Sequence, residues 1–216
     1  MDHSVSLVQA YLQLNGYFTV ARYPTIETAS KYGYEITSDH NILAFRFPGA
    51  GCLITGSSDC LVFNPDPILG MDTAKADMLV GEVEAGRASQ NHTARSPNVL
   101  RTVLARFGCC PYETSASMVK QLLRMGCAVT QSGYRIRLMV FGSLIPNSTP
   151  SGCPVISLGH MVTFIEAYLQ QNWSTLHGSQ FERPSLGLFM VLENARREQE
   201  KSEKALGLIR YVEASL

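Results

Sequence analysis

The hydrophobic and polar positions along the chain follow two periods, that of a helix and that of a strand. Apolar residues recur at helical spacing over residues 5–15, after which Asn15 and Gly16 supply a left-handed stop. Short runs rich in β-branched and aromatic residues indicate strands between polar turns. The predicted helices cover residues 5–15, 98–107, 115–125, 159–172 and 185–214, and the predicted strands cover residues 17–26, 34–37, 41–47, 78–84, 127–130, 134–141 and 155–158.

This mixed order of elements predicts an α/β sandwich in which helices flank a central mixed sheet. A chain of 216 residues is long enough for one full core and an appendage. We therefore expect one domain over residues 1–178 and a C-terminal helical extension over residues 179–216. The extension is apolar at both ends and charged at its centre, so we expect it either to pack on the domain or to pair with a second chain as a homodimer.

Composition narrows the class of protein. Hydrophobic residues make up 45% of the chain and charged residues 17%, which is typical of globular proteins. We find no apolar stretch long enough to span a bilayer and no signal-peptide pattern at the start, so we expect a cytoplasmic protein with no membrane partner. No two cysteines form a C-x-x-C pair, which favours free thiols over a zinc site. The six cysteines of the chain are Cys52, Cys60, Cys109, Cys110, Cys127 and Cys153.

The net charge is zero, but the charges are unevenly distributed. Residues 1–84 hold four Lys and Arg against ten Asp and Glu. Residues 85–140 hold eight basic residues against the single acid Glu113. An acidic first part followed by a basic middle is typical of a metal site beside a track for a polyanion such as DNA, although scattered solvated arginines give the same count. The basic residues are Arg87, Arg95, Arg101, Arg106, Lys120, Arg124, Arg135 and Arg137.

Two carboxylates lie on the strand predicted over residues 78–84. Glu82 and Glu84 are two positions apart, so strand alternation places both side chains on one face. Two like charges held so close are unfavourable unless a cation or a proton lies between them. The pair therefore indicates a divalent-metal site, and exposure of both at a strand end is the alternative.

The preceding strand supplies further oxygen ligands if it pairs antiparallel with this one. Pairing that places residue 47 near 78 and residue 41 near 84 brings Asp39 and Asn41 beside Glu82 and Glu84. Carboxylate and amide oxygens are the ligands that Mg²⁺ and Mn²⁺ prefer. The pattern therefore predicts a metal site at one end of this strand pair.

Three segments, in this order, resemble the PD-(D/E)XK, or restriction-endonuclease-like, nuclease superfamily. They are the opening helix and strand at residues 8–20 (VQAYLQLNGYFTV), the aspartate entering the second strand at 38–44 (SDHNILA), and GEVE at 81–84 in place of the family's E-x-K. The resemblance covers roughly residues 4–172. It implies a three-layer sandwich, and it matches Glu82 to the metal-binding acid.

The same resemblance assigns the other site residues. Asp39 or Asn41 falls where the family's metal-binding aspartate is expected, and Asp66 of the Pro65-Asp66 pair is a second candidate that we expect at the far end of the hairpin. Two residues depart from the family's pattern, because Glu84 replaces its lysine and Asn41 its aspartate. The missing positive charge is then expected from Arg87, Lys75 or Lys120.

The activity that the resemblance implies is hydrolysis of phosphodiester bonds in DNA by an endonuclease or exonuclease with Mg²⁺ or Mn²⁺. Asp39 and Glu82 are expected to hold the metal, Glu84 to be a ligand or the general base, and Arg87 to bind phosphate. The alternative is a catalytically inactive nuclease-fold protein that binds nucleic acid or another protein. A third interpretation is an unrelated α/β protein whose E-x-E is merely exposed.

Overall fold

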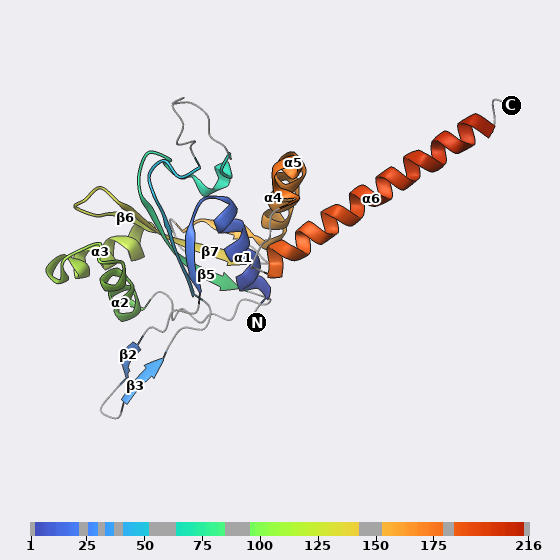
Figure 1. Ribbon diagram of the computed structural model, residues 1–216. Coiled ribbons are helices and arrows are strands. Elements are labelled where there is room, and N and C mark those ends of the chain that lie inside the picture. The colour runs from blue at the N-terminus through green and yellow to red at the C-terminus, as the bar shows by residue number, and fades with distance from the viewer. Residues whose placement is uncertain are drawn as a thin grey trace. The chain divides into compact units, whose positions relative to one another are not determined.

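The computed structural model describes residues 3–21, 26–29, 33–36, 41–51, 64–84, 96–142, 153–178 and 184–213 (Figure 1). Contacts divide the chain into two compact units, Met1–Met161 and Val162–Leu216. In chain order the elements are α1 (His3–Leu14), β1 (Phe18–Ala21), β2 (Ile26–Ala29), β3 (Gly33–Ile36), β4 (Asn41–Arg46), a short 3-10 helix (Pro67–Leu69), β5 (Asp77–Glu84), α2 (Pro97–Phe107), α3 (Tyr112–Met125), β6 (Cys127–Val129), β7 (Arg135–Gly142), β8 (Val155–Ser157), α4 (Leu158–Gln171), α5 (Trp173–Leu176) and α6 (Pro184–Glu213).

The described strands of the first unit form a six-stranded mixed sheet and a separate two-stranded hairpin of β2 and β3. The large sheet has the order β1-β4-β5-β7-β6, and β8 pairs with β7 beyond the end of β6. Strands β1, β4 and β5 are successively antiparallel, whereas β5 and β7 are parallel. The prediction of an α/β fold around a mixed sheet is confirmed.

Most predicted elements are observed within two residues of their expected ends, and two differ more. The strand expected over 17–26 is observed as β1, which ends at Ala21, and β2, which begins at Ile26. Helix α3 begins at Tyr112 rather than residue 115, directly after Pro111, whose backbone is extended. The left-handed stop expected after the first helix is present at Gly16, whose φ is 83°.

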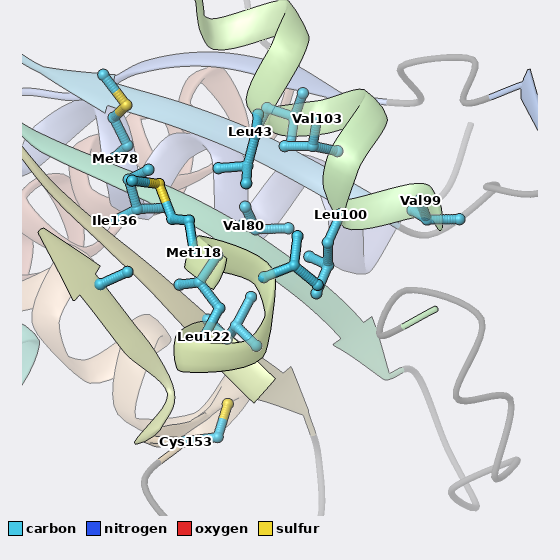
Figure 2. Close-up of a cluster of buried hydrophobic side chains, with 14 of the residues drawn as sticks. Leu43, Met78, Val80, Val99, Leu100, Val103, Met118, Leu122, Ile136 and Cys153 are labelled. Carbon is cyan, nitrogen blue, oxygen red and sulfur yellow. The ribbon is translucent and has the colours of Figure 1, made fainter. Parts of the chain in front are cut away.

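A hydrophobic core lies between the sheet and the helix pair α2–α3 (Figure 2). Leu43 of β4 is the cross-strand partner of Val80 of β5, and Val80 is the partner of Leu138 of β7. The three side chains therefore share one face of the sheet. The stripe of Leu100, Val103 and Leu104 on α2 and that of Met118, Val119 and Leu122 on α3 are buried against this face. Helix α1 contacts β1, β4 and β5, whose alternate residues Ile42 and Leu79 are also fully buried. The sheet of this unit is therefore covered on both faces.

Gly81 lies in the middle of β5 at a point where no side chain fits. A Cβ added there would lie 2.8 Å from Cε2 of Phe141, a ring that is fully buried on β7. We expect Gly81→Ala to lower the free energy of unfolding by about 1–3 kcal/mol, because the ring has nowhere to move. Urea unfolding followed by circular dichroism measures this change. Gly187→Ala on α6 is the control, since its Cβ meets nothing within 4 Å and a helical alanine is favourable. Equal effects of the two substitutions would contradict this packing.

The second unit contains the rest of α4 from Val162, then α5 and the 30-residue helix α6. Among the described residues, we find no helix with both the length and the apolar character required to cross a membrane.

Candidate functional site

The carboxylate pair lies at the end of the inner strand pair β4–β5 where β5 ends and β4 begins. Asn41 is the cross-strand partner of Glu82, and Arg46 is the partner of Asp77. The predicted antiparallel pairing is confirmed, but the expected register, with residue 41 near 84, is wrong by two residues. A shift of two residues preserves the faces of both strands, so Asn41 and Glu82 still belong to the same face.

Glu82 and Glu84 occupy the same face of β5 and are both half-buried. Their partners on the parallel neighbour β7 are Val140 and Gly142. The same face carries Val80 two residues earlier, which belongs to the core under α2 and α3. The carboxylates therefore begin where the hydrophobic core ends, and glycine rather than a bulky residue lies next to Glu84.

Other predicted site residues fall wholly or partly outside the described part of the chain. Asp39 and Arg87 lie outside it, and the side chain of Asn41 is likewise not described. In the described residues we find no group of three or more His, Cys, Asp or Glu side chains that could hold a metal ion. The described part of this site therefore contains two carboxylates, Glu82 and Glu84, whose oxygens are of the kind that hard divalent ions bind.

Asp66, the alternative acid, has a different and buried role. Its Oδ2 accepts hydrogen bonds from the Tyr11 hydroxyl at 2.8 Å and contacts Nε2 of His160 at 2.6 Å, and its Oδ1 accepts from the Ile68 backbone at 3.1 Å. These contacts join α1, the 3-10 helix and the start of α4, whose first turn is capped by the Ser157 hydroxyl. Asp66 therefore connects three elements and forms no metal-binding group with Glu82 and Glu84 among the described residues.

A second buried network lies at the start of β5, opposite the glutamates along the strand. Asp77 accepts hydrogen bonds from Nε of Arg137 at 2.9 Å, from Nη2 of Arg137 and from the Tyr17 hydroxyl. Arg137 also donates to the Leu69 carbonyl, and both charged side chains are almost inaccessible to solvent. Arg137 thus forms a buried ion pair and adds no positive charge to the surface, although it belongs to the basic segment over residues 85–140.

The other described residues of the basic segment, together with Lys75, either lie on α2 and α3 or pair with groups near the start of β5 and β7. Arg106, Lys120 and Arg124 are exposed on α2 and α3, and the guanidinium of Arg101 lies 4.9 Å above the exposed ring of Tyr112. Arg135 donates to the Gly70 carbonyl, and Lys75 pairs with Asp72 at 2.9 Å. Exposed cations therefore gather on the two helices that cover the face of the sheet carrying Glu82 and Glu84.

Tyr11 and Tyr17 each donate a hydrogen bond to a buried carboxylate, and this makes the stability of the fold sensitive to high pH. Burial first, and then the neighbouring carboxylates Asp66 and Asp77, raise the pKa of Tyr11 and of Tyr17 above the ordinary value near 10. Above that pH the unfolded chain loses these protons while the folded chain keeps them, so the unfolded state binds fewer protons and stability falls as pH rises.

We expect unfolding free energy to decrease steadily above pH 10, and Tyr17→Phe to make this decrease shallower. Urea titrations at several pH values between 9 and 11.5 measure the slope. Tyr112→Phe, made on a ring that is 77% exposed, is the matched control and should keep the wild-type slope. A Tyr17→Phe slope as steep as that of the control would refute the assignment.

Comparison of the chain with protein-family models, with curated proteins and with solved structures found no match.

Proposed function

We propose that this protein is a divalent-metal-dependent, nuclease-like protein that hydrolyses phosphodiester bonds in DNA at the edge formed by β4 and β5. The observation that supports this proposal is the pairing of Asn41 with Glu82. Asp39 precedes Asn41 by two residues in the sequence. Asp39, Glu82 and Glu84 together form an all-oxygen donor set of the kind that suits Mg²⁺ or Mn²⁺.

Each site residue has a separate role in this proposal. Glu82 and Asp39 hold the ion, while Glu84 is a further ligand or the general base that accepts a proton from water. Arg87, three residues after Glu84, binds the phosphate. The ion itself supplies a more acidic bound water and positive charge against the charge that develops on phosphate.

The proposed fold is restriction-endonuclease-like, a three-layer sandwich. Its support is the order of the elements that build the large sheet: helix α1, the antiparallel strands β1, β4 and β5, the helix pair α2 and α3, the short strand β6, and then β7, which is parallel to β5. Helices α2 and α3 carry the exposed Arg106, Lys120 and Arg124, with Arg101 half-buried beside Tyr112, against the single acid Glu113. This excess of exposed cations favours a polyanion such as DNA, since contacts to phosphate account for most of non-specific affinity.

A cleavage assay with restored family residues tests the proposal. Plasmid and linear DNA are incubated with the full chain in Mg²⁺ or Mn²⁺, with EDTA as the metal-free control. We expect slow, metal-dependent cleavage by wild type and at least about tenfold faster cleavage by Glu84→Lys, because Glu82 and Asp39 still hold the ion, and the charge that a lysine stabilises on the phosphate outweighs the loss of the Glu84 carboxylate. The double variant Asn41→Asp/Glu84→Lys should cleave fastest. If none of the three proteins cleaves, the nuclease proposal is wrong.

The second candidate function is a catalytically inactive module that binds nucleic acid or another protein. Two observations favour it, the loss of the family's lysine and aspartate at positions 84 and 41 and the exposed cations of α2 and α3. It predicts DNA binding without cleavage, weakening as salt rises. Lys120→Glu/Arg124→Glu should abolish that binding, while Lys75→Glu, a charge reversal in the loop before β5, should leave most of it. Equal losses in both variants would argue against a binding surface on α3.

A further inference from the structure

The first residue of α3, Tyr112, is an aromatic side chain that lies almost entirely in solvent. It is 77% exposed, the largest exposed fraction among the large apolar side chains that the structure describes. Burial therefore contributes little to the choice of a ring at this position, since little apolar area is removed from water. A single exposed ring becomes informative when its surroundings suit one class of partner.

Arg101 on α2 holds this ring from one side. Its guanidinium carbon lies 4.9 Å from the centre of the Tyr112 ring, a cation–π contact between two helices that contact each other (Figure 1). An aromatic ring has two faces and the guanidinium covers one, so the high exposure of Tyr112 leaves the other face open. The pair thus offers an open π-face with a positive charge beside it.

Two exposed cations follow Tyr112 along one ridge of α3. Residues 112, 116, 120 and 124 succeed one another at intervals of four, so they form a ridge that winds slowly around the helix, and all four are exposed. We call these residues the α3 ridge: Tyr112, Ala116, Lys120 and Arg124. Lys120 lies about 12 Å along the axis from Tyr112, and Arg124 about 6 Å further. Ala116 adds no bulky side chain between the ring and the cations.

The charge of this surface is complementary to a polyanion. The single acid of the two helices, Glu113, faces four basic residues on α2 and α3. Glu113 follows Tyr112 directly, so helix geometry turns its side chain about 100° around the axis from the ring. Lys120 and Arg124 are separated by about 6 Å along the axis, which is close to the spacing of neighbouring phosphates in an extended strand. The α3 ridge therefore suits a backbone that runs along the helix.

A ring beside such cations favours nucleic acid whose bases are unpaired. Binding of single strands combines a positively charged track for the backbone with aromatic side chains on which bases stack. In a duplex, neighbouring base pairs cover the faces of the bases, so an exposed ring gains nothing from them. Phosphates attract the cations in either case. The ring is therefore the element of this surface that distinguishes single strands from duplex.

We infer that the α3 ridge binds a single-stranded segment of DNA, with one base stacked on the open face of Tyr112 and nearby phosphates on Lys120 and Arg124. Arg101 is a positioning residue that orients the ring. This inference rests on the DNA binding in the proposed function and adds the substrate class, which is DNA with an unpaired segment such as a single-stranded end.

Affinities for single-stranded and duplex DNA test the stacking. Fluorescence anisotropy, with EDTA present to prevent cleavage, follows a labelled single strand of about 12 nucleotides and the duplex of the same sequence. Tyr112→Ala should weaken single-strand binding at least about fivefold, the loss expected for one stacked base, and leave duplex binding within about twofold. Tyr112→Phe keeps the ring and should bind as wild type does. Tyr112→Leu keeps an apolar side chain without a π-face and should bind as Tyr112→Ala does.

A matched control and a spectroscopic signal separate stacking from a structural effect. Tyr134→Ala removes another exposed tyrosine, directly before β7 and outside the α3 ridge, and should leave both affinities unchanged. A 2-aminopurine base in the single strand should lose fluorescence on binding to wild type, because stacking quenches it. The same probe should lose clearly less on Tyr112→Ala at saturating protein. Urea unfolding verifies that both alanine variants are folded under the conditions of the assay.

Salt dependence separates the ring from the cations. Tyr112→Ala removes no charge, so it should keep the wild-type slope of log affinity against log salt for the single strand. Lys120→Ala/Arg124→Ala should make that slope shallower by about 1.4, the change expected for two lost phosphate contacts.

Three results would overturn the inference: no binding of the single strand by wild type, equal single-strand affinities of wild type and Tyr112→Ala, or equal losses for single strand and duplex. The cleavage assay decides the proposed function separately. If no protein cleaves DNA but Tyr112→Ala specifically loses single-strand affinity, the nuclease proposal is wrong and the stacking site stands. If wild type cleaves DNA and Tyr112→Ala binds the single strand equally well, only the stacking site is wrong.

Discussion

Cleavage of DNA in Mg²⁺ or Mn²⁺ should fall at least about 100-fold when Glu82 is replaced by glutamine. Even residues that only support a metal ligand cost up to about 100-fold in affinity or activity when they are removed, and Glu82 is proposed as a ligand itself. The amide preserves the size of the side chain at its half-buried position opposite Asn41 but removes the charge. The rate of plasmid nicking at saturating metal measures the effect, and the Glu84→Lys background raises its sensitivity.

A matched variant separates loss of the site from loss of the fold. Glu113→Gln makes the same change on an exposed residue of the first turn of α3 and should leave cleavage within a few-fold of wild type. DNA binding by Glu82→Gln, measured by fluorescence anisotropy, should persist, because the proposed phosphate contacts come from the basic helices. Cleavage that survives Glu82→Gln would remove β5 from the proposed active site.

The largest effect on stability is expected at Asp77. Replacing it with alanine leaves the guanidinium of Arg137 buried without its counter-ion and the Tyr17 hydroxyl without its acceptor. Breaking one side of a buried ion pair typically costs about 3–5 kcal/mol. We expect a loss of that size in the free energy of unfolding of Asp77→Ala, measured by urea denaturation at neutral pH.

Two further variants identify the cause of that loss. In Asp77→Leu/Arg137→Met both charges are replaced by apolar groups, so most of the lost stability should return. Asp72→Ala removes an exposed acid that pairs with Lys75, and solvent screening should make its effect small. If the double variant is as unstable as Asp77→Ala, the loss comes from packing and not from the unpaired charge.

Strand alternation was sufficient to predict the face of the two glutamates. A period of two admits only one relation between Glu82 and Glu84, whatever strand lies beside them. The partner strand was also predictable from its apolar run, but its register was not. About thirty residues join Arg46 to Asp77, and a connection of that length does not restrict which residues pair. The two-residue error in the expected pairing of Asn41 comes from this freedom.

The buried polar networks could not be predicted from the sequence, because the residues that form them are far apart along the chain. Tyr11 and Asp66 are 55 positions apart, and Asp77 and Arg137 are 60 apart. Arg137 alternates with apolar residues and so fits an exposed strand face equally well. His160 gave no motif either, since its partner Asp66 is 94 positions away. Only the packing of α1, β5, β7 and α4 brings these side chains together.

The position of β5 between β4 and β7 has a consequence for the order of folding. Its pairing with β4 joins Arg46 to Asp77, whereas its pairing with β7 joins Asp77 to Arg135 and Glu84 to Gly142. During synthesis, β5 can pair with β4 on one side, but its other side stays unpaired until residue 142 has emerged. Helices α2 and α3 are made in between. Such long-range parallel pairing is intrinsically slow, and an exposed apolar edge is a template for association with other chains. A nascent chain that ends before β7 should for this reason depend on chaperones far more than the finished protein does.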